Sequence, residues 1–153
     1  MIRACLVFVA IAASVALSAC GDDDEEEPAG LEHDVHVHLD EWSVETEPSS
    51  LTGPGTVAFG GHNHGKYPHQ VTVLKTDMPI DELPIDRGRV DTDEAGDLMM
   101  EFEVPQAGEE EGLQVGSTEL AVGNYAIFCN IPGHYLQGMV AAFEVTEAPA
   151  GTP

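Results

Sequence analysis

Three residues whose side chains can bind a soft metal stand at equal intervals near the C-terminal end of the chain. The segment CNIPGHYLQGM, residues 129–139, places Cys129, His134 and Met139 five residues apart. A thiolate, an imidazole and a thioether form a ligand set that suits copper. A blue-copper electron-transfer site needs one further imidazole, because it combines two histidines, one cysteine and a weak axial methionine. One of the other histidines in the sequence must therefore supply the second imidazole.

The first half of the chain offers three candidates for this second imidazole. His69 is favoured, because it follows Pro68 and opens a strand in which apolar residues alternate. His62 and His64 are rivals within residues 60–68, a glycine-rich stretch that we expect to be a loop. The sequence predicts a metal site built from His69, Cys129, His134 and Met139.

A second group of histidines lies near the predicted start of the domain. His36 and His38 are two residues apart in a segment that alternates like a strand, and His33 precedes them. Such a pair could chelate a surface metal. The interpretation we favour is a solvated polar face that also carries Asp34 and Asp40.

The elements that must position the candidate ligands are strands. Short apolar alternations separated by glycine and proline favour an all-β, antiparallel Greek-key sandwich, with a long loop or short helix in the middle. We expect loops at 60–68 and 105–116 and the long loop at 75–95. The expected strands are 34–40, 56–59, 69–74, 98–104, 119–129 and 138–146.

The phase of the last two expected strands brings the two sulfur atoms together. Tyr125, Ile127 and Cys129 share one strand face, and the alternate positions from Met139 to Val145 share another. If both faces point inward, one row ends with the cysteine sulfur and the other begins with the methionine sulfur. His134 lies on the connecting loop, so one end of the sandwich gathers three ligands.

The beginning of the sequence predicts export and a membrane anchor. Residues 1–19 have a positive start and a short apolar run, which is typical of a secretory signal peptide. Leu17 to Cys20 resembles a lipobox, so we expect Cys20 to be lipidated on an extracytoplasmic membrane surface. Residues 20–32 then form an acidic flexible tether, 33–147 the domain and 148–153 a disordered tail.

Composition excludes one class of partner. The chain has 28 acidic and 5 basic residues, which give a net charge of −23. This charge would repel nucleic acid. It suits docking to a redox protein with a basic face, such as a cytochrome or another copper protein.

Two segments together resemble a known family. YPHQVTV (67–73) and GNYAIFCNIPGHYLQGMVAAFEV (123–145) are similar to the cupredoxins, small blue-copper proteins, and the Cys-x4-His-x4-Met spacing is closest to their auracyanin-like members. The resemblance implies one type I copper per chain. It assigns His69, Cys129 and His134 as equatorial ligands and Met139 as the axial ligand. It also implies that Tyr125 closes a Greek-key corner.

At position 70 the chain departs from the usual pattern of the family. Gln70 stands where the family usually has an asparagine that braces the cysteine loop, and its longer amide either reaches Asn130 or leaves that loop without this brace.

In the family the loop histidine reaches the surface through an apolar patch. The residues flanking His134 that could form this patch are Ile131, Pro132, Tyr135 and Leu136.

The resemblance implies an electron carrier rather than an enzyme. The neighbours of Cys129 are Phe128 and Asn130, so the adjacent histidine that relays electrons in copper oxidases is absent from the sequence. The loop has one cysteine, whereas a two-copper centre needs two. The alternative function is an extracytoplasmic carrier that delivers copper itself to another protein.

Overall fold

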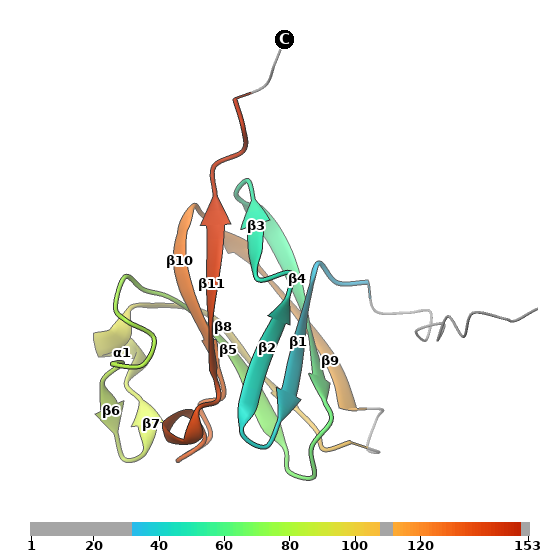
Figure 1. Ribbon diagram of the computed structural model, residues 1–153, viewed down its shortest axis with the longest axis vertical. Coiled ribbons are helices and arrows are strands. Elements are labelled where there is room, and N and C mark those ends of the chain that lie inside the picture. Colours follow the sequence, from blue (N-terminus) through green and yellow to red (C-terminus); the bar gives the residue numbers. More distant parts are fainter. Residues whose placement is uncertain (1–31, 108–111, 151–153) are drawn as a thin grey trace, which may run out of the picture.

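Two β-sheets pack face to face in the computed structural model, which describes residues 32–107 and 112–150 (Figure 1). One sheet has the strand order β2-β1-β4-β9 and the other has the order β3-β11-β10-β5-β8. The strands of the first sheet are β1 (Val35–Asp40), β2 (Ser43–Glu47), β4 (Gly55–Asn63) and β9 (Leu113–Leu120). Those of the second are β3 (Ser50–Thr52), β5 (His69–Lys75), β8 (Asp97–Val104), β10 (Gly123–Phe128) and β11 (Val140–Thr146).

The connectivity confirms the predicted all-β Greek-key sandwich. The chain changes sheets on entering and on leaving β3, between β4 and β5, between β8 and β9, and again between β9 and β10. The sheets are mixed, however, and the expected antiparallel pairing does not hold for two strand pairs. β1 pairs in parallel with β4, and β3 pairs in parallel with β11.

Strand β1 contributes every second residue to the core, whereas β5 is buried on both of its faces. Val35, Val37 and Leu39 are completely buried between the sheets, while the residues between them face outward. In β5 both faces are buried, because a chain excursion covers the outer face of this sheet. The excursion contains β6 (Ile85–Asp86), β7 (Arg89–Val90) and the short helix α1 (Thr92–Ala95), which matches the expected loop with a short helix.

Several predicted boundaries are wrong. The expected loop at 60–68 begins too early, since β4 continues to Asn63. The two sheets approach closely at Gly61, where a Cβ atom would lie 2.7 Å from a methyl group of Val104. Strand β9 starts at Leu113, so the expected loop at 105–116 is too long. The alternation also failed to predict β2 and β3, which are short and carry few buried residues.

The expected strand at 119–129 is two strands in different sheets. The chain leaves β9 at Leu120 and enters β10 at Gly123. The Tyr125 hydroxyl donates a 2.7 Å hydrogen bond to the Ala121 carbonyl across this corner. That contact is the corner role expected for Tyr125.

Some predictions fall on residues outside the described part of the chain. These are the signal peptide at 1–19, the lipid site at Cys20, almost all of the 20–32 tether and residues 151–153 of the tail. Among the described residues, no helix has the length and apolar character needed to cross a membrane.

Candidate metal centre

Adjacent strands bring two of the predicted ligands to one end of the second sheet. His69 is the first residue of β5, and Cys129 directly follows the last residue of β10. These strands pair antiparallel with Thr72 opposite Phe128, so the start of β5 lies beside the end of β10. The Gln70 backbone N–H donates to the Cys129 sulfur at 3.3 Å. The cysteine side chain is thus fixed beside the histidine by backbone pairing.

Three candidate ligand atoms form a compact triangle. The Cys129 Sγ atom lies 3.3 Å from His134 Nδ1 and 3.9 Å from His69 Nδ1, and the two ring nitrogens are 3.3 Å apart. From these three distances, a point in their plane lies about 2.0 Å from each atom, close to the usual length of metal–imidazole bonds and somewhat shorter than that of metal–thiolate bonds. The side chains present therefore fit a trigonal metal ion with nitrogen and thiolate ligands.

Met139 lies in the same packed end of the sandwich. It is completely buried and belongs to the core cluster that contains Cys129 and Ile127. Its carbonyl accepts a 3.1 Å hydrogen bond from the Cys129 N–H, and its N–H donates to the His134 carbonyl. The backbone thus ties Met139 to both neighbouring candidates, and its role as an axial ligand stays a prediction from the sequence.

Glycines shape the loop that carries His134. Gly133 has φ of 88° and Gly138 has φ of 107°, both in the left-handed region that glycine adopts without strain. Between them lies a 3₁₀ turn, Tyr135–Gln137, which ends with a hydrogen bond from the Gly138 N–H to the Tyr135 carbonyl. The sequence PGHYLQG therefore forms a tight loop that returns the chain to β11.

The β6–β7 hairpin braces this loop from outside, and Figure 1 shows the two side by side. The side-chain Oδ1 of Asn130 accepts from the Val90 N–H at 2.8 Å, and its side-chain Nδ2 donates to the Val90 carbonyl at 3.3 Å. The Gln70 amide does not reach Asn130, and its buried Oε1 atom has no hydrogen-bond partner. The brace expected from position 70 is therefore supplied by the hairpin.

Replacing Asn130 with alanine should destabilise the domain. The substitution leaves the N–H and carbonyl of the buried Val90 without partners, and we expect a loss of about 1–3 kcal/mol in the free energy of unfolding. Denaturant unfolding of the metal-free protein measures it. Asn124→Ala is the control, because that amide bonds the exposed Asp77 carboxylate and its loss should cost less than about 0.5 kcal/mol. Equal losses in both variants would contradict the bracing role.

Burial sets the protonation states of the candidate ligands. It lowers the pKa of His69, and the neighbouring His134 lowers it further against the opposing effect of Glu41. Burial also lowers the pKa of His134. It raises the pKa of Cys129, although the N–H groups of Ile131 and Gln70 oppose this shift. Both imidazoles are therefore neutral ligands near pH 7, while metal binding must release a proton from the thiol.

Two residues beside the centre were not predicted from the sequence. The Trp42 ring meets the His134 ring edge to face with centroids 5.0 Å apart. The Glu41 carboxylate accepts hydrogen bonds from the N–H groups of Lys66 and Tyr67, and it lies 3.8 Å from the buried His69 Nε2. At that distance the carboxylate does not hydrogen-bond to the neutral ring, but its negative charge lies beside it. The β1–β2 turn brings both residues there, and the alternation pattern gave no sign of that hairpin.

The structure separates His69 from its rivals. His62 lies in β4 and clusters with His33 and His36, and His64 contacts His38. Neither rival belongs to the group with Cys129. The structure thus places His69, and neither rival, beside the thiol, and its role as a ligand stays a prediction.

The apolar surface around His134 differs in part from the prediction. Leu136 is 61% exposed and Pro132 is also exposed, but Tyr135 is buried in a hydrophobic cluster with Leu83 and Phe128. Its hydroxyl donates to the Ile80 carbonyl and accepts from the Leu83 N–H, which explains its burial. Tyr135 is therefore removed from the predicted patch.

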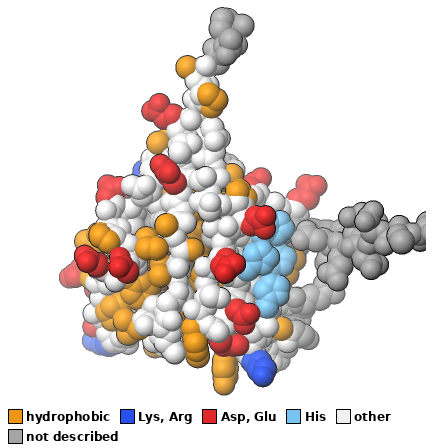
Figure 2. All heavy atoms as spheres, viewed as in Figure 1, with side chains coloured by type: hydrophobic (Ala, Val, Ile, Leu, Met, Phe, Trp, Pro, Cys, Tyr) orange, Lys and Arg blue, Asp and Glu red, His pale blue; other side chains and the backbone are white. Residues whose placement is uncertain are grey.

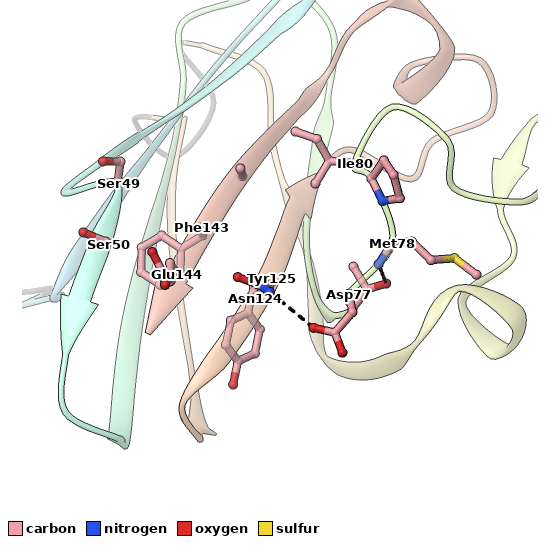
Figure 3. Close-up of a pocket in the computed structure, with 12 residues that line it drawn as sticks. Ser49, Ser50, Asp77, Met78, Ile80, Asn124, Tyr125, Phe143 and Glu144 are labelled. Carbon is pink, nitrogen blue, oxygen red and sulfur yellow. Dashed lines mark hydrogen bonds between the residues drawn. The ribbon is translucent and has the colours of Figure 1, made fainter. Parts of the chain in front are cut away.

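A surface pocket of about 680 Å³ lies elsewhere on the domain (Figure 3). It is lined by residues such as Ser50, Asp77, Tyr125 and Glu144, and the residues that line it include no histidine or cysteine. Asn124 and Asp77 bond to each other across its edge. The candidate chemistry of the chain is not located there.

Comparisons with known proteins give structural similarities only. No family model and no curated protein matches the sequence. A reduced auracyanin from the photosynthetic bacterium Roseiflexus castenholzii is 18% identical, with 78% of this chain and 100% of that chain covered and a TM-score of 0.49. A rusticyanin from Thiobacillus ferrooxidans is also 18% identical, with coverage of 72% and 76% and a TM-score of 0.49.

A third solved structure is similar to the same degree. Auracyanin A, a "blue" copper protein from Chloroflexus aurantiacus, is 19% identical, with coverage of 72% and 96% and a TM-score of 0.46. At these identities and TM-scores, the function of the chain must be inferred from its own site.

Proposed function

We propose that the chain is a blue-copper electron carrier that holds one type I copper ion through His69, Cys129, His134 and Met139. The observation that carries the proposal is the triangle of one sulfur and two nitrogens, whose edges of 3.3, 3.3 and 3.9 Å fit a single metal ion. A thiolate with two imidazoles and a thioether is the donor set of blue copper. When bound, copper supplies one-electron redox chemistry.

The protein's contribution is to hold these side chains in one arrangement. His69, Cys129 and Met139 are completely buried, so water is excluded from three of the four. The Gln70 N–H donates to the Cys129 sulfur, and the Cys129 N–H donates to the Met139 carbonyl, which together restrict the movement of the sulfur atom. A fixed ligand set reduces the rearrangement that accompanies each change of oxidation state.

The surface near His134 supports electron exchange with another protein. His134 is partly exposed, while Leu136, Trp42 and Tyr67 present 61%, 38% and 58% of their surfaces to solvent. Aromatic residues are enriched in protein interfaces. We propose that this apolar area contacts the redox partner, and that the acidic surface favours partners with basic faces.

One absorption spectrum tests the proposal. The full chain loaded with Cu(II) should show an intense visible thiolate-to-copper charge-transfer band, and it should cycle between oxidised and reduced forms with its copper retained. A colourless Cu(II) form, or release of copper on reduction, would instead support the alternative role of copper delivery. The buried thiolate favours electron transfer, because release would require opening a packed core.

The Glu41→Gln variant should bind copper more weakly. The Glu41 carboxylate fixes the loop before His69 through Lys66 and Tyr67, and its negative charge lies beside the His69 ring. Outer partners of metal-ligating histidines typically contribute 10–100-fold to affinity, and we expect a loss of about 10-fold. Competition with a copper chelator measures the affinity. Glu144→Gln on β11 is the matched control, and an equal change there would refute the specific role of Glu41.

We further propose that the carrier is tethered outside the cytoplasm through a lipid on Cys20. The support is the sequence of residues 1–32, with its short apolar segment, lipobox-like cysteine and acidic run. Labelling with a fatty-acid analogue should mark the wild-type chain and leave Cys20→Ala unmarked. Equal labelling of the two chains would contradict the proposal of a lipid anchor at Cys20.

A further inference from the structure

A dense patch of histidines covers the outer face of the first sheet. In β1, His36 and His38 alternate with the buried apolar residues and therefore point away from the core. β4 runs parallel beside β1 with His62 opposite His38 in register. Figure 2 shows the histidine side chains as one continuous pale blue patch, flanked by acidic side chains. The ring contacts identify the members of the patch as His33, His36, His38, His62 and His64.

Three ring nitrogens within this patch lie close together. His33 Nε2 lies 3.0 Å from His36 Nδ1 and 3.4 Å from His62 Nε2, and a ligand atom from each of the three histidines lies within 4.8 Å of the others. Nitrogen ligands at bond lengths of 2.0–2.1 Å around one tetrahedral ion are about 3.3 Å apart. The separations of His33 Nε2 from the other two nitrogens are therefore close to those around a bound ion.

A glycine makes this approach possible. Gly60 in β4 stands opposite His36, and a Cβ atom there would lie only 2.5 Å from the His33 ring. The His33 ring thus packs directly against the backbone of Gly60, and this position lets it lie beside the rings of His36 and His62. Any larger residue at position 60 would displace it.

The surroundings favour a cation. On β2, Glu47 pairs with His36 and Glu45 pairs with His38, so both carboxylates lie on the histidine side of the sheet. The whole chain carries a net charge of −23. A divalent ion here would meet negative potential as well as imidazole ligands.

We propose that His33, His36 and His62 form a second metal site that binds a divalent first-row ion, with Cu(II) held most tightly. Imidazole suits copper and zinc, and affinity along the divalent series peaks at Cu(II). This site lacks sulfur ligands and lies on the outer face of the other sheet, so it is distinct from the Cys129 centre. Cu(II) bound there gives no intense thiolate band.

Titration of the full chain with Cu(II) alone tests the site. The first equivalent should develop the visible band, and a second should add a nitrogen-ligated Cu(II) signal in electron paramagnetic resonance without further visible colour. In His36→Gln the affinity for this second ion should fall at least about 10-fold, while the visible band is unchanged. His38→Gln is the matched control on the same strand face, and it should alter the affinity less than His36→Gln does, because His38 lies outside the group of three.

Each other result overturns the proposal. A chain that takes up no second ion shows that the three rings only hydrogen-bond one another. A second ion that His36→Gln binds as tightly as wild type lies elsewhere, and a larger effect of His38→Gln places it at the His38–His64 pair. Repeating the titration in Cys129→Ser keeps the test independent of the blue-copper proposal, since the nitrogen-ligated signal and its dependence on His36 should persist there.

Discussion

Cys129→Ser is expected to abolish the visible band of the copper-loaded protein. The band arises from charge transfer between a thiolate sulfur and Cu(II), and Cys129 is the only cysteine within the described residues. Serine preserves the shape of the side chain but supplies a hydroxyl, which stays protonated and is a poor ligand for copper. Absorption spectra of the wild-type and variant full chains, each loaded with one equivalent of Cu(II), make the comparison.

The control must show that lost colour does not reflect a damaged core. Ile127 is completely buried, belongs to the same β10 row and core cluster as Cys129, and has no metal-binding atom. Ile127→Val should cost about 0.5–1.5 kcal/mol of stability and retain the full band. If Cys129→Ser keeps its colour, the ligand assignment fails. If Ile127→Val also loses its colour, the band reports packing rather than sulfur.

The sequence predicted the local part of the centre well. Alternation in β10 and β11 put Cys129 and Met139 at the ends of inward-facing rows, and both residues are completely buried there. The strand that begins at His69 was also predicted correctly. These features depend on side-chain periodicity within a single strand, which is directly visible in a sequence.

Features that depend on pairing between distant segments were not predictable in this way. Glu41 and Trp42 reach the centre only because the β1–β2 turn lies against the start of β5 and the loop of His134. The histidine cluster requires β1 and β4 to pair in parallel with one specific register. Alternation tells which residues share a face, but not which strand lies alongside. His62 was therefore expected in a loop, although it lies within a strand.

Phe59→Ala should produce the largest loss of stability outside the metal centre. Phe59 is completely buried in β4, and its ring meets the Phe143 ring of the opposite sheet with centroids 5.8 Å apart. Truncating a buried phenylalanine typically costs 3–5 kcal/mol, through lost transfer free energy and the cavity left behind. Since domains of this kind are stable by about 5–15 kcal/mol, the variant should lose a large fraction of its stability. Denaturant midpoints of the metal-free wild type and variant measure the change.

Leu98→Ala is the matched truncation on an exposed site. Leu98 is 49% exposed on β8, so its removal should change the free energy of unfolding by no more than about 0.5 kcal/mol. A loss in Phe59→Ala as small as that of the control would mean that the two sheets repack without a cavity.

Phe59→Ala also distinguishes an effect on the stability of the domain from an effect on the metal centre. None of the four predicted copper ligands lies on β4, the strand that carries Phe59. Phe59→Ala should therefore keep the visible band at temperatures where it is folded and lose it at a lower melting temperature than wild type. Cys129→Ser should do the opposite, with colour lost from a chain that stays folded. If Phe59→Ala shifts or bleaches the band while folded, the ligand geometry depends on contacts between the two sheets and not on the loop and backbone hydrogen bonds alone.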